Sequence, residues 1–117
     1  MTLFELYETV GGDYQNVLER LGDMETIEIF VLRFSDDFSY SQLLQYLQKN
    51  DLKHAFCAAH TLKGVSQNLG FSRLGDCAST LCEVLRKKIA PSEDLLQQLK
   101  REFCCVITAI NDFKNGI

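Results

Sequence analysis

The chain contains almost no residue that would interrupt a helix. Its 117 residues include one proline and seven glycines, and the glycines gather at a few breaks. Between these breaks apolar residues recur mostly at helical spacing, and strand signals are nearly absent. The chain is long enough for one domain with a sizeable core. We therefore predict that residues 1–117 form a single all-α domain, an antiparallel up-and-down four-helix bundle with short amino-terminal helices packed at one end.

Caps and breaks along the chain place the expected helices. Two short helices, over Thr2 to Val10 and from Asp13 to about Leu21, should form a lid. The segment from Glu25 to Lys49 predicts one long helix or two abutting ones, and its weak point is Ser35 to Ser41. The last three helices are expected over residues 51–69, from 72 to about 88, and from 93 to about 115.

Charge and composition disfavour several classes of function. The net charge is −4 and the basic residues are scattered, which disfavours binding to nucleic acid. No apolar stretch approaches the roughly 20 residues that span a bilayer, and the acidic start is unlike a signal peptide, so we expect a cytoplasmic protein without a membrane partner. Five cysteines without a C-x-x-C pair are expected to be reduced thiols in helix interfaces, namely Cys57, Cys77, Cys82, Cys104 and Cys105.

The expected helix from Asp51 to Leu69 carries the residues of most chemical interest. At about 100° of rotation per residue, one arc forms a core face of Leu52, Ala55, Ala59, Leu62, Ser66 and Leu69. His60, Gly64 and Gln67 lie nearly opposite, so His60 should be exposed. Glycine in a helix interior costs about 0.8–1.0 kcal/mol relative to alanine. Gly64, four residues after His60, would keep the surface beside the imidazole clear, and Lys63 can swing its ammonium over the same place.

These residue types suit phosphoryl chemistry. A neutral imidazole, whose ordinary pKa is near 6.5, can attack phosphorus through a ring nitrogen. The Lys63 ammonium would then balance the transferred charge. Other interpretations stay open for each residue alone: His60 as a solvated side chain, Lys63 as a solubilising charge, and Gly64 as a helix-packing contact. Their joint spacing on one exposed face favours the chemical interpretation.

The next helix is expected to bring further residues beside His60. The turn near Phe71 makes an antiparallel hairpin, in which Cys82 lies level with His60 and Arg86 lies about one turn beyond Cys82. Arg86 can then reach the phosphoryl oxygens, or it can be an ordinary cation at the end of its helix, where the helix dipole favours positive charge.

The sequence HTLKGVSQNLG, residues 60–70, resembles the signature H-x-L-K-G-x-S-x-x-L-G of histidine phosphotransfer (HPt) domains at every fixed position. The resemblance extends from about residue 3 to residue 115. It implies that His60 is phosphorylated, that Lys63 stabilises the charge and that Gly64 gives a partner clearance. It also implies that the partners are receiver domains or a hybrid sensor histidine kinase. The receiver would bring the acceptor aspartate and the Mg²⁺, so no cofactor is expected on this chain.

The chain departs from many family members at one place beside the histidine. Those members carry a glutamine there, but this chain has Cys82, and a thiol is a poor hydrogen-bonding substitute for an amide. Gln67, Cys82 and Arg86 are expected as auxiliary phosphate or partner contacts. Phe56 and Val65 are candidate apolar contacts for the docked partner.

Two other functions are alternatives to a phosphocarrier. An adaptor with the same fold would bind receivers without chemistry, and the Cys82 departure keeps that alternative open. A bundle enzyme of the di-iron type needs paired Glu-x-x-His motifs, but Asp51 precedes His54 and Cys57 precedes His60 at that spacing, so no metal site is expected. The chain also lacks a nucleotide-binding loop. We expect a monomeric carrier that is not an enzyme and does not phosphorylate itself from ATP.

Overall fold

The computed structural model describes residues 1–116, and these residues form helices and no strand. This confirms the predicted all-α class. The described part of the chain has seven helices in the order α1 (Leu3–Val10), α2 (Tyr14–Leu21), α3 (Met24–Phe34), α4 (Ser39–Gln48), α5 (Leu52–Asn68), α6 (Ser72–Arg86) and α7 (Glu93–Lys114).

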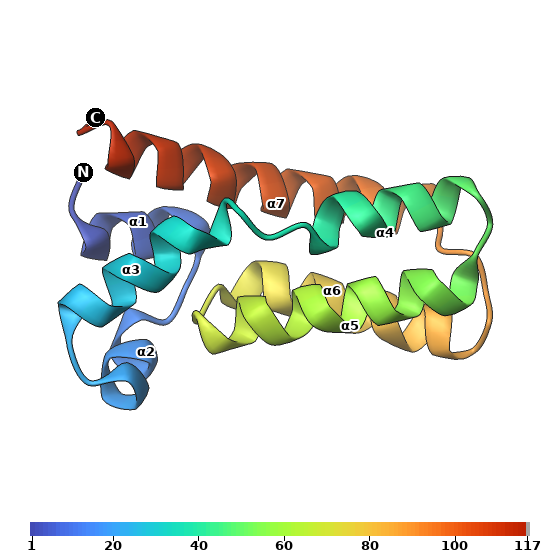
Figure 1. Ribbon diagram of the computed structural model, residues 1–117, viewed down its shortest axis with the longest axis horizontal. Helices are drawn as coiled ribbons and strands as arrows, with labels where there is room; N and C mark the ends of the chain where they lie inside the picture. Colours follow the sequence, from blue (N-terminus) through green and yellow to red (C-terminus); the bar gives the residue numbers. More distant parts are fainter. Residues whose placement is uncertain (117) are drawn as a thin grey trace.

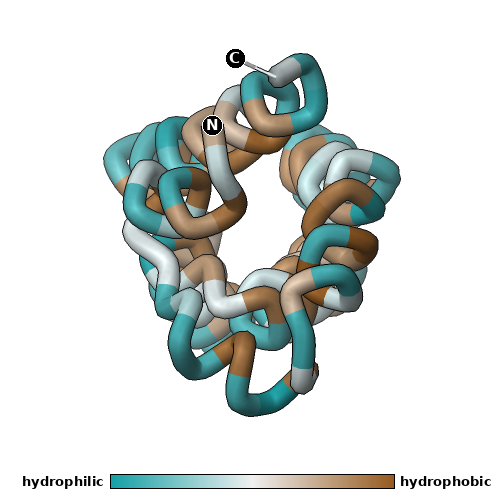
Figure 2. The backbone as a smooth tube through the Cα atoms, turned by 90° about the vertical axis from the view of Figure 1, so that its left-hand side faces the viewer, coloured by the Kyte–Doolittle hydropathy of each residue, from teal (hydrophilic) through white to brown (hydrophobic). Residues whose placement is uncertain are grey.

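The bundle consists of α4, α5, α6 and α7, which run up and down beside one another (Figure 1). The long α7 extends past the other three, and α1 and α3 pack against its carboxyl-terminal half. Figure 2, seen from that end, shows apolar segments turned toward the middle of the molecule. The predicted bundle with short helices at one end is therefore confirmed.

The segment predicted as one long helix or two abutting ones is two helices. α3 ends at Phe34 and α4 begins at Ser39, so the break falls in the predicted weak point. The Asp37 carboxylate accepts a hydrogen bond of 2.8 Å from the backbone N–H of Ser39, which supports the start of α4. Phe38 in this break is 71% exposed.

Small residues and one glycine turn allow α5 and α6 to pack closely. Gly70 has φ of +70°, a left-handed conformation that glycine adopts readily, and it ends α5 as predicted. On α6, a β-carbon at Gly75 would lie only 3.0 Å from Cγ of Gln67 on α5. The hairpin register expected from the sequence places these two residues level, and the contact confirms it.

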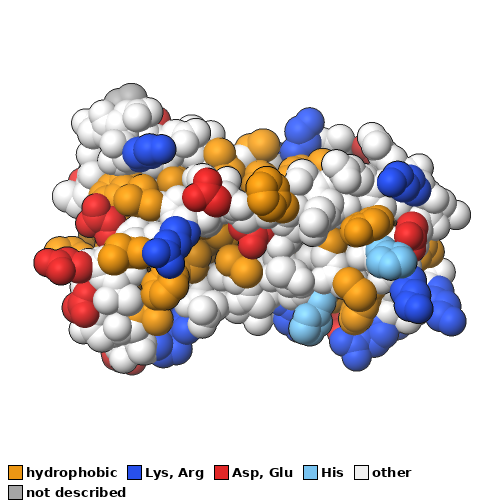
Figure 3. Space-filling model, viewed as in Figure 1, with side chains coloured by type: hydrophobic (Ala, Val, Ile, Leu, Met, Phe, Trp, Pro, Cys, Tyr) orange, Lys and Arg blue, Asp and Glu red, His pale blue; other side chains and the backbone are white. Residues whose placement is uncertain are grey.

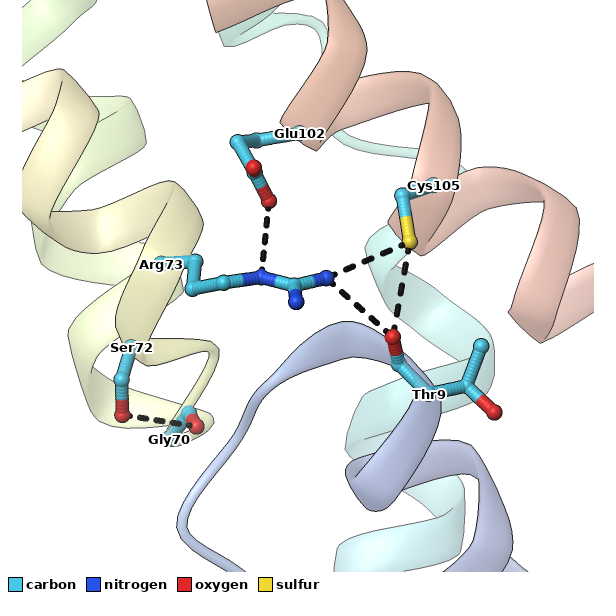
Figure 4. Close-up of polar contacts among 6 residues, drawn as sticks. All are labelled: Thr9, Gly70, Ser72, Arg73, Glu102 and Cys105. Carbon is cyan, nitrogen blue, oxygen red and sulfur yellow. Dashed lines mark hydrogen bonds and ion pairs between the residues drawn. The ribbon is translucent and has the colours of Figure 1, made fainter.

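The amino-terminal helices are tied to the rest of the molecule by polar contacts, one of them buried and the others exposed. The Tyr7 hydroxyl on α1 donates a 2.6 Å hydrogen bond to the Leu69 carbonyl oxygen at the end of α5. The Arg73 guanidinium on α6 donates to the Glu102 carboxylate at 3.0 Å and to the Thr9 carbonyl oxygen at 3.1 Å (Figure 4). Arg73 therefore links α6 to α7 and to the end of α1.

The cysteines only partly follow the prediction. All five are free, and Cys77 and Cys82 are buried between helices as expected. Cys57 and Cys104 are exposed, so the interface position expected for them is wrong. A free thiol is tolerated on the outer face of a helix as well as in an interface. None of the described helices combines the length and the apolar character needed to cross a membrane.

Candidate functional site

His60 lies in the middle of α5 with its side chain exposed, as the helical periodicity predicts. The Asp51 side chain starts the helix by accepting a hydrogen bond of 3.1 Å from the backbone N–H of His54. The predicted core face is buried at Ala55, Ala59, Leu62, Ser66 and Leu69, whereas Leu52 is half-buried. Since this face holds α5 against the bundle, the imidazole projects from a rigid support. Both histidines, pale blue in Figure 3, lie on the face shown there.

Gly64 has open space above it, because a β-carbon built at this position meets no atom within 4 Å. The alternative interpretation, a helix-packing contact, does not fit this geometry. A hollow of about 670 Å³ lies beside Gly64 and is called here the Gly64 hollow. The residues that line it include Val65 and Gln67 from α5, Arg20 from α2, and Phe30, Arg33 and Phe34 from α3.

The lining of the Gly64 hollow includes residues that the sequence did not indicate. Phe30, for example, lines the hollow and is 42% exposed. Arg20 donates hydrogen bonds to the carbonyl oxygens of Asn68, at 2.8 Å, and of Gln67, at 3.3 Å, and so caps the carboxyl end of α5. In the sequence, Phe30 belongs to the same apolar helical pattern as Ile27 and Phe34, and this pattern does not show that Phe30 is exposed beside α5.

Lys63 and Cys82 lie close enough to influence each other. Burial raises the pKa of the Cys82 thiol, and the Lys63 ammonium acts in the opposite direction. Lys63 itself is half-buried, one turn from the imidazole. Cys82 is only 1% exposed, so a partner cannot touch its thiol. The expectation that Cys82 is a phosphate or partner contact is therefore corrected, because the rotation of α6 turns this side chain into the bundle.

Arg86 lies over Phe56, one turn before His60 on α5. Its Cζ atom is 5.5 Å from the Phe56 ring centroid, within the range of a cation–π interaction. The Phe56 and His60 rings are neighbours on α5, with their centroids 6.0 Å apart. Arg86 Nη2 also lies 3.6 Å from a Glu83 carboxylate oxygen.

The second histidine does not join the site. His54 Nδ1 lies 2.7 Å from an Asp51 carboxylate oxygen, and the His54 ring stacks near Tyr46 with centroids 5.2 Å apart. Within residues 1–116, no group of three or more His, Cys, Asp and Glu side chains could hold a metal ion. The candidate site thus consists of His60, Lys63 and Gly64, with Phe56 on one side and Gln67 on the other.

Comparison with known families gives one match. The family model described as the Hpt domain matches residues 15–109, which include all of these site residues. No curated protein and no solved structure matches the chain.

Proposed function

Because the chain belongs to the Hpt domain family, whose members carry phosphoryl groups in two-component signalling, we propose that His60 accepts a phosphoryl group from one receiver aspartate and passes it to another. The observation that carries this proposal is the exposed imidazole with open space above Gly64, four residues further along the same helix. That space lets another protein's backbone approach the reacting nitrogen.

The proposed step needs only a nucleophile and a nearby charge from this chain. One ring nitrogen of neutral His60 attacks the phosphorus of the aspartyl phosphate. An N–P bond forms, the P–O bond to the aspartate breaks, and the aspartate leaves as a carboxylate. The other ring nitrogen keeps its proton. Lys63, one turn away, lowers the electrostatic cost of placing the phosphoryl oxygens on α5. The Mg²⁺ that assists such a transfer belongs to the receiver.

The surface around His60 supports docking by a receiver domain. The Gly64 hollow offers an apolar surface, including exposed Phe30 and half-buried Val65, and three charged residues, the cations Arg20 and Arg33 and the acidic Asp37. An interface with an apolar middle and a polar rim matches the usual anatomy of protein contacts. We propose that the receiver covers this hollow and His60 together, and that the chain acts in the cytoplasm as a monomer whose functional face stays open.

One observation supports a second candidate function, an adaptor that binds receivers without chemistry. With Cys82 buried, no thiol or amide from that position of α6 is available to orient the imidazole. Phe56 contacts the ring but cannot accept or donate a conventional hydrogen bond. An adaptor would keep its binding and its signalling role after His60 is replaced, whereas a carrier would lose the role.

Transfer from a phosphorylated receiver domain tests the proposal. The wild type, His60→Gln and His54→Gln would each be mixed with the receiver, and the chain would then be assayed for acid-labile, base-stable phosphate. His54→Gln is the matched control, because it removes the other exposed histidine of α5. Label on the wild type and the control, but not on His60→Gln, supports the carrier. Absence of label from all three, with receiver binding intact, supports the adaptor.

A further inference from the structure

A second hollow lies on the other side of His60 from the Gly64 hollow. It has a volume of about 760 Å³, is lined by Phe56, and is called here the Phe56 hollow. Its apolar lining includes Leu52 and Leu85. Because the Phe56 ring lies beside the His60 ring, a partner that covers the imidazole from this side also reaches the hollow.

The charged residues that line the Phe56 hollow are all basic. Lys53, Arg86 and Lys88 line it, and no Asp or Glu is among the described residues that do so. Arg86 has Glu83 at 3.6 Å, but neither Lys53 nor Lys88 is within ion-pair distance of a carboxylate in the described part of the chain. In a chain of net charge −4, three cations around one hollow are a local reversal of the overall charge. On the face shown in Figure 3, blue basic side chains gather near the pale-blue histidines.

Lys88 occupies a backbone position that usually belongs to glycine. It directly follows Lys87, the C-cap residue of α6, and its φ is +60°. Its backbone N–H donates a hydrogen bond of 2.9 Å to the Leu85 carbonyl oxygen. The left-handed conformation is unfavourable for a lysine and favourable for glycine. The fold therefore tolerates an unfavourable residue at the rim of the hollow, and this residue adds a cation there. Asn50, with φ of +55°, occupies the equivalent position after α4 and also lines the hollow, without a charge.

We propose that the Phe56 hollow is the docking site for an acidic segment of the receiver, in which carboxylates flank an apolar side chain. The apolar side chain would contact Leu52 and Phe56, and the carboxylates would lie near Lys53, Arg86 and Lys88. The proposal rests on the proposed carrier function and adds to it a preference for receivers with an acidic docking segment. The molecule as a whole is acidic, so its net charge repels an acidic partner. These cations attract such a partner toward His60.

Two glycine variants separate the effect of the Lys88 charge from the effect of the left-handed backbone conformation. Lys88→Gly removes one charge and relieves the left-handed lysine, so the fold should melt at the same or a higher temperature. Asn50→Gly makes the same backbone change at the same hollow without loss of charge. A third variant, Lys53→Glu, reverses one charge on the exposed side of α5, where no described contact depends on it.

Each variant would be labelled by a phosphorylated receiver domain at low and at moderate salt, and by phosphoramidate, which needs no protein contact. We expect Lys88→Gly to slow transfer from the receiver about two- to fivefold at low salt, as for the loss of one exposed ion pair. Lys53→Glu should slow it more, and Asn50→Gly should not change it. Added salt should shrink the differences. Phosphoramidate should label all four proteins equally.

Different results would overturn the proposal. Transfer from the receiver at the wild-type rate in both lysine variants would show that the hollow is not used. Equal slowing with phosphoramidate would show that the lysines act on His60 itself rather than on the partner. If neither donor labels the wild type, the carrier function fails, and the hollow is judged by receiver binding: weaker binding of the lysine variants alone supports it, and unchanged binding overturns it.

Discussion

Replacement of Gly64 by alanine should stabilise the fold while it impairs transfer from a receiver. The gain in stability follows from two observations. Gly64 lies inside α5, where glycine is about 0.8–1.0 kcal/mol less favourable than alanine, and the added methyl group meets no atom within 4 Å. With an unfolding entropy of about 2.1 cal/mol/K per residue, a 117-residue chain should melt roughly 4 °C higher.

The slower transfer from the receiver follows from the same open space above Gly64. If the receiver's backbone occupies the region above Gly64, a methyl group there acts as an overpacked atom, for which a cost of about 1–3 kcal/mol is usual. Taking the lower part of that range, we expect transfer from the receiver to slow about tenfold. Labelling by phosphoramidate should change little, because the imidazole remains exposed.

Thermal melting followed by circular dichroism, and the rate of transfer at limiting receiver concentration, would measure the two effects. Gly75→Ala is a useful contrast, since its β-carbon would lie 3.0 Å from Gln67 Cγ and the gain in stability should be smaller. A Gly64→Ala protein that melts lower than the wild type would refute the packing argument. One that accepts phosphate from the receiver at the wild-type rate would refute the clearance argument.

Two further predictions concern stability. Tyr7→Phe should lower the free energy of unfolding by roughly 1–2 kcal/mol in urea titrations, because the Leu69 carbonyl oxygen loses its buried 2.6 Å donor; an unchanged value would refute this. Stability should also fall at both ends of the pH scale. Backbone hydrogen bonds, from Thr26 and His54 respectively, lower the pKa of Asp23 and Asp51, so their contribution is present above the unfolded pKa, about 4, and is lost as the pH falls further. Burial raises the pKa of Cys82 above its ordinary 9.0, so its contribution is present below that value and is lost as the pH rises past it. A melting temperature that stays constant from pH 3 to 10 would contradict this reasoning.

The α5–α6 hairpin was predictable because local rules determine it. The period of α5 separates His60 from Ala59 and Leu62, and Gly70 sets the turn and with it the register of α6. The sequence predicted the position of Cys82 along the hairpin, but it did not predict that the Cys82 side chain is buried. The position depends on residue count alone, whereas the burial depends on how far α6 is rotated against its neighbours.

The surroundings of His60 were less predictable because they depend on tertiary contacts. A long side chain such as Arg86 can reach several partners from one backbone position, and here it lies over Phe56. Arg20 and Phe30 come from α2 and α3, whose position beside the Gly64 hollow is not encoded in the α5 pattern. The sequence therefore indicated the candidate residue His60 and the open space at Gly64, and the structure added the two hollows on either side.

If His60 carries the phosphoryl group, the phosphate must be found on this residue of the labelled protein. The wild type would be labelled with phosphoramidate and by a phosphorylated receiver, and then fragmented in a mass spectrometer under conditions that preserve N–P bonds. The proposed function predicts one phosphoryl group per chain, on His60 with either donor. Phosphate on His54, on a carboxylate or on a cysteine, with His60 unmodified, would contradict it.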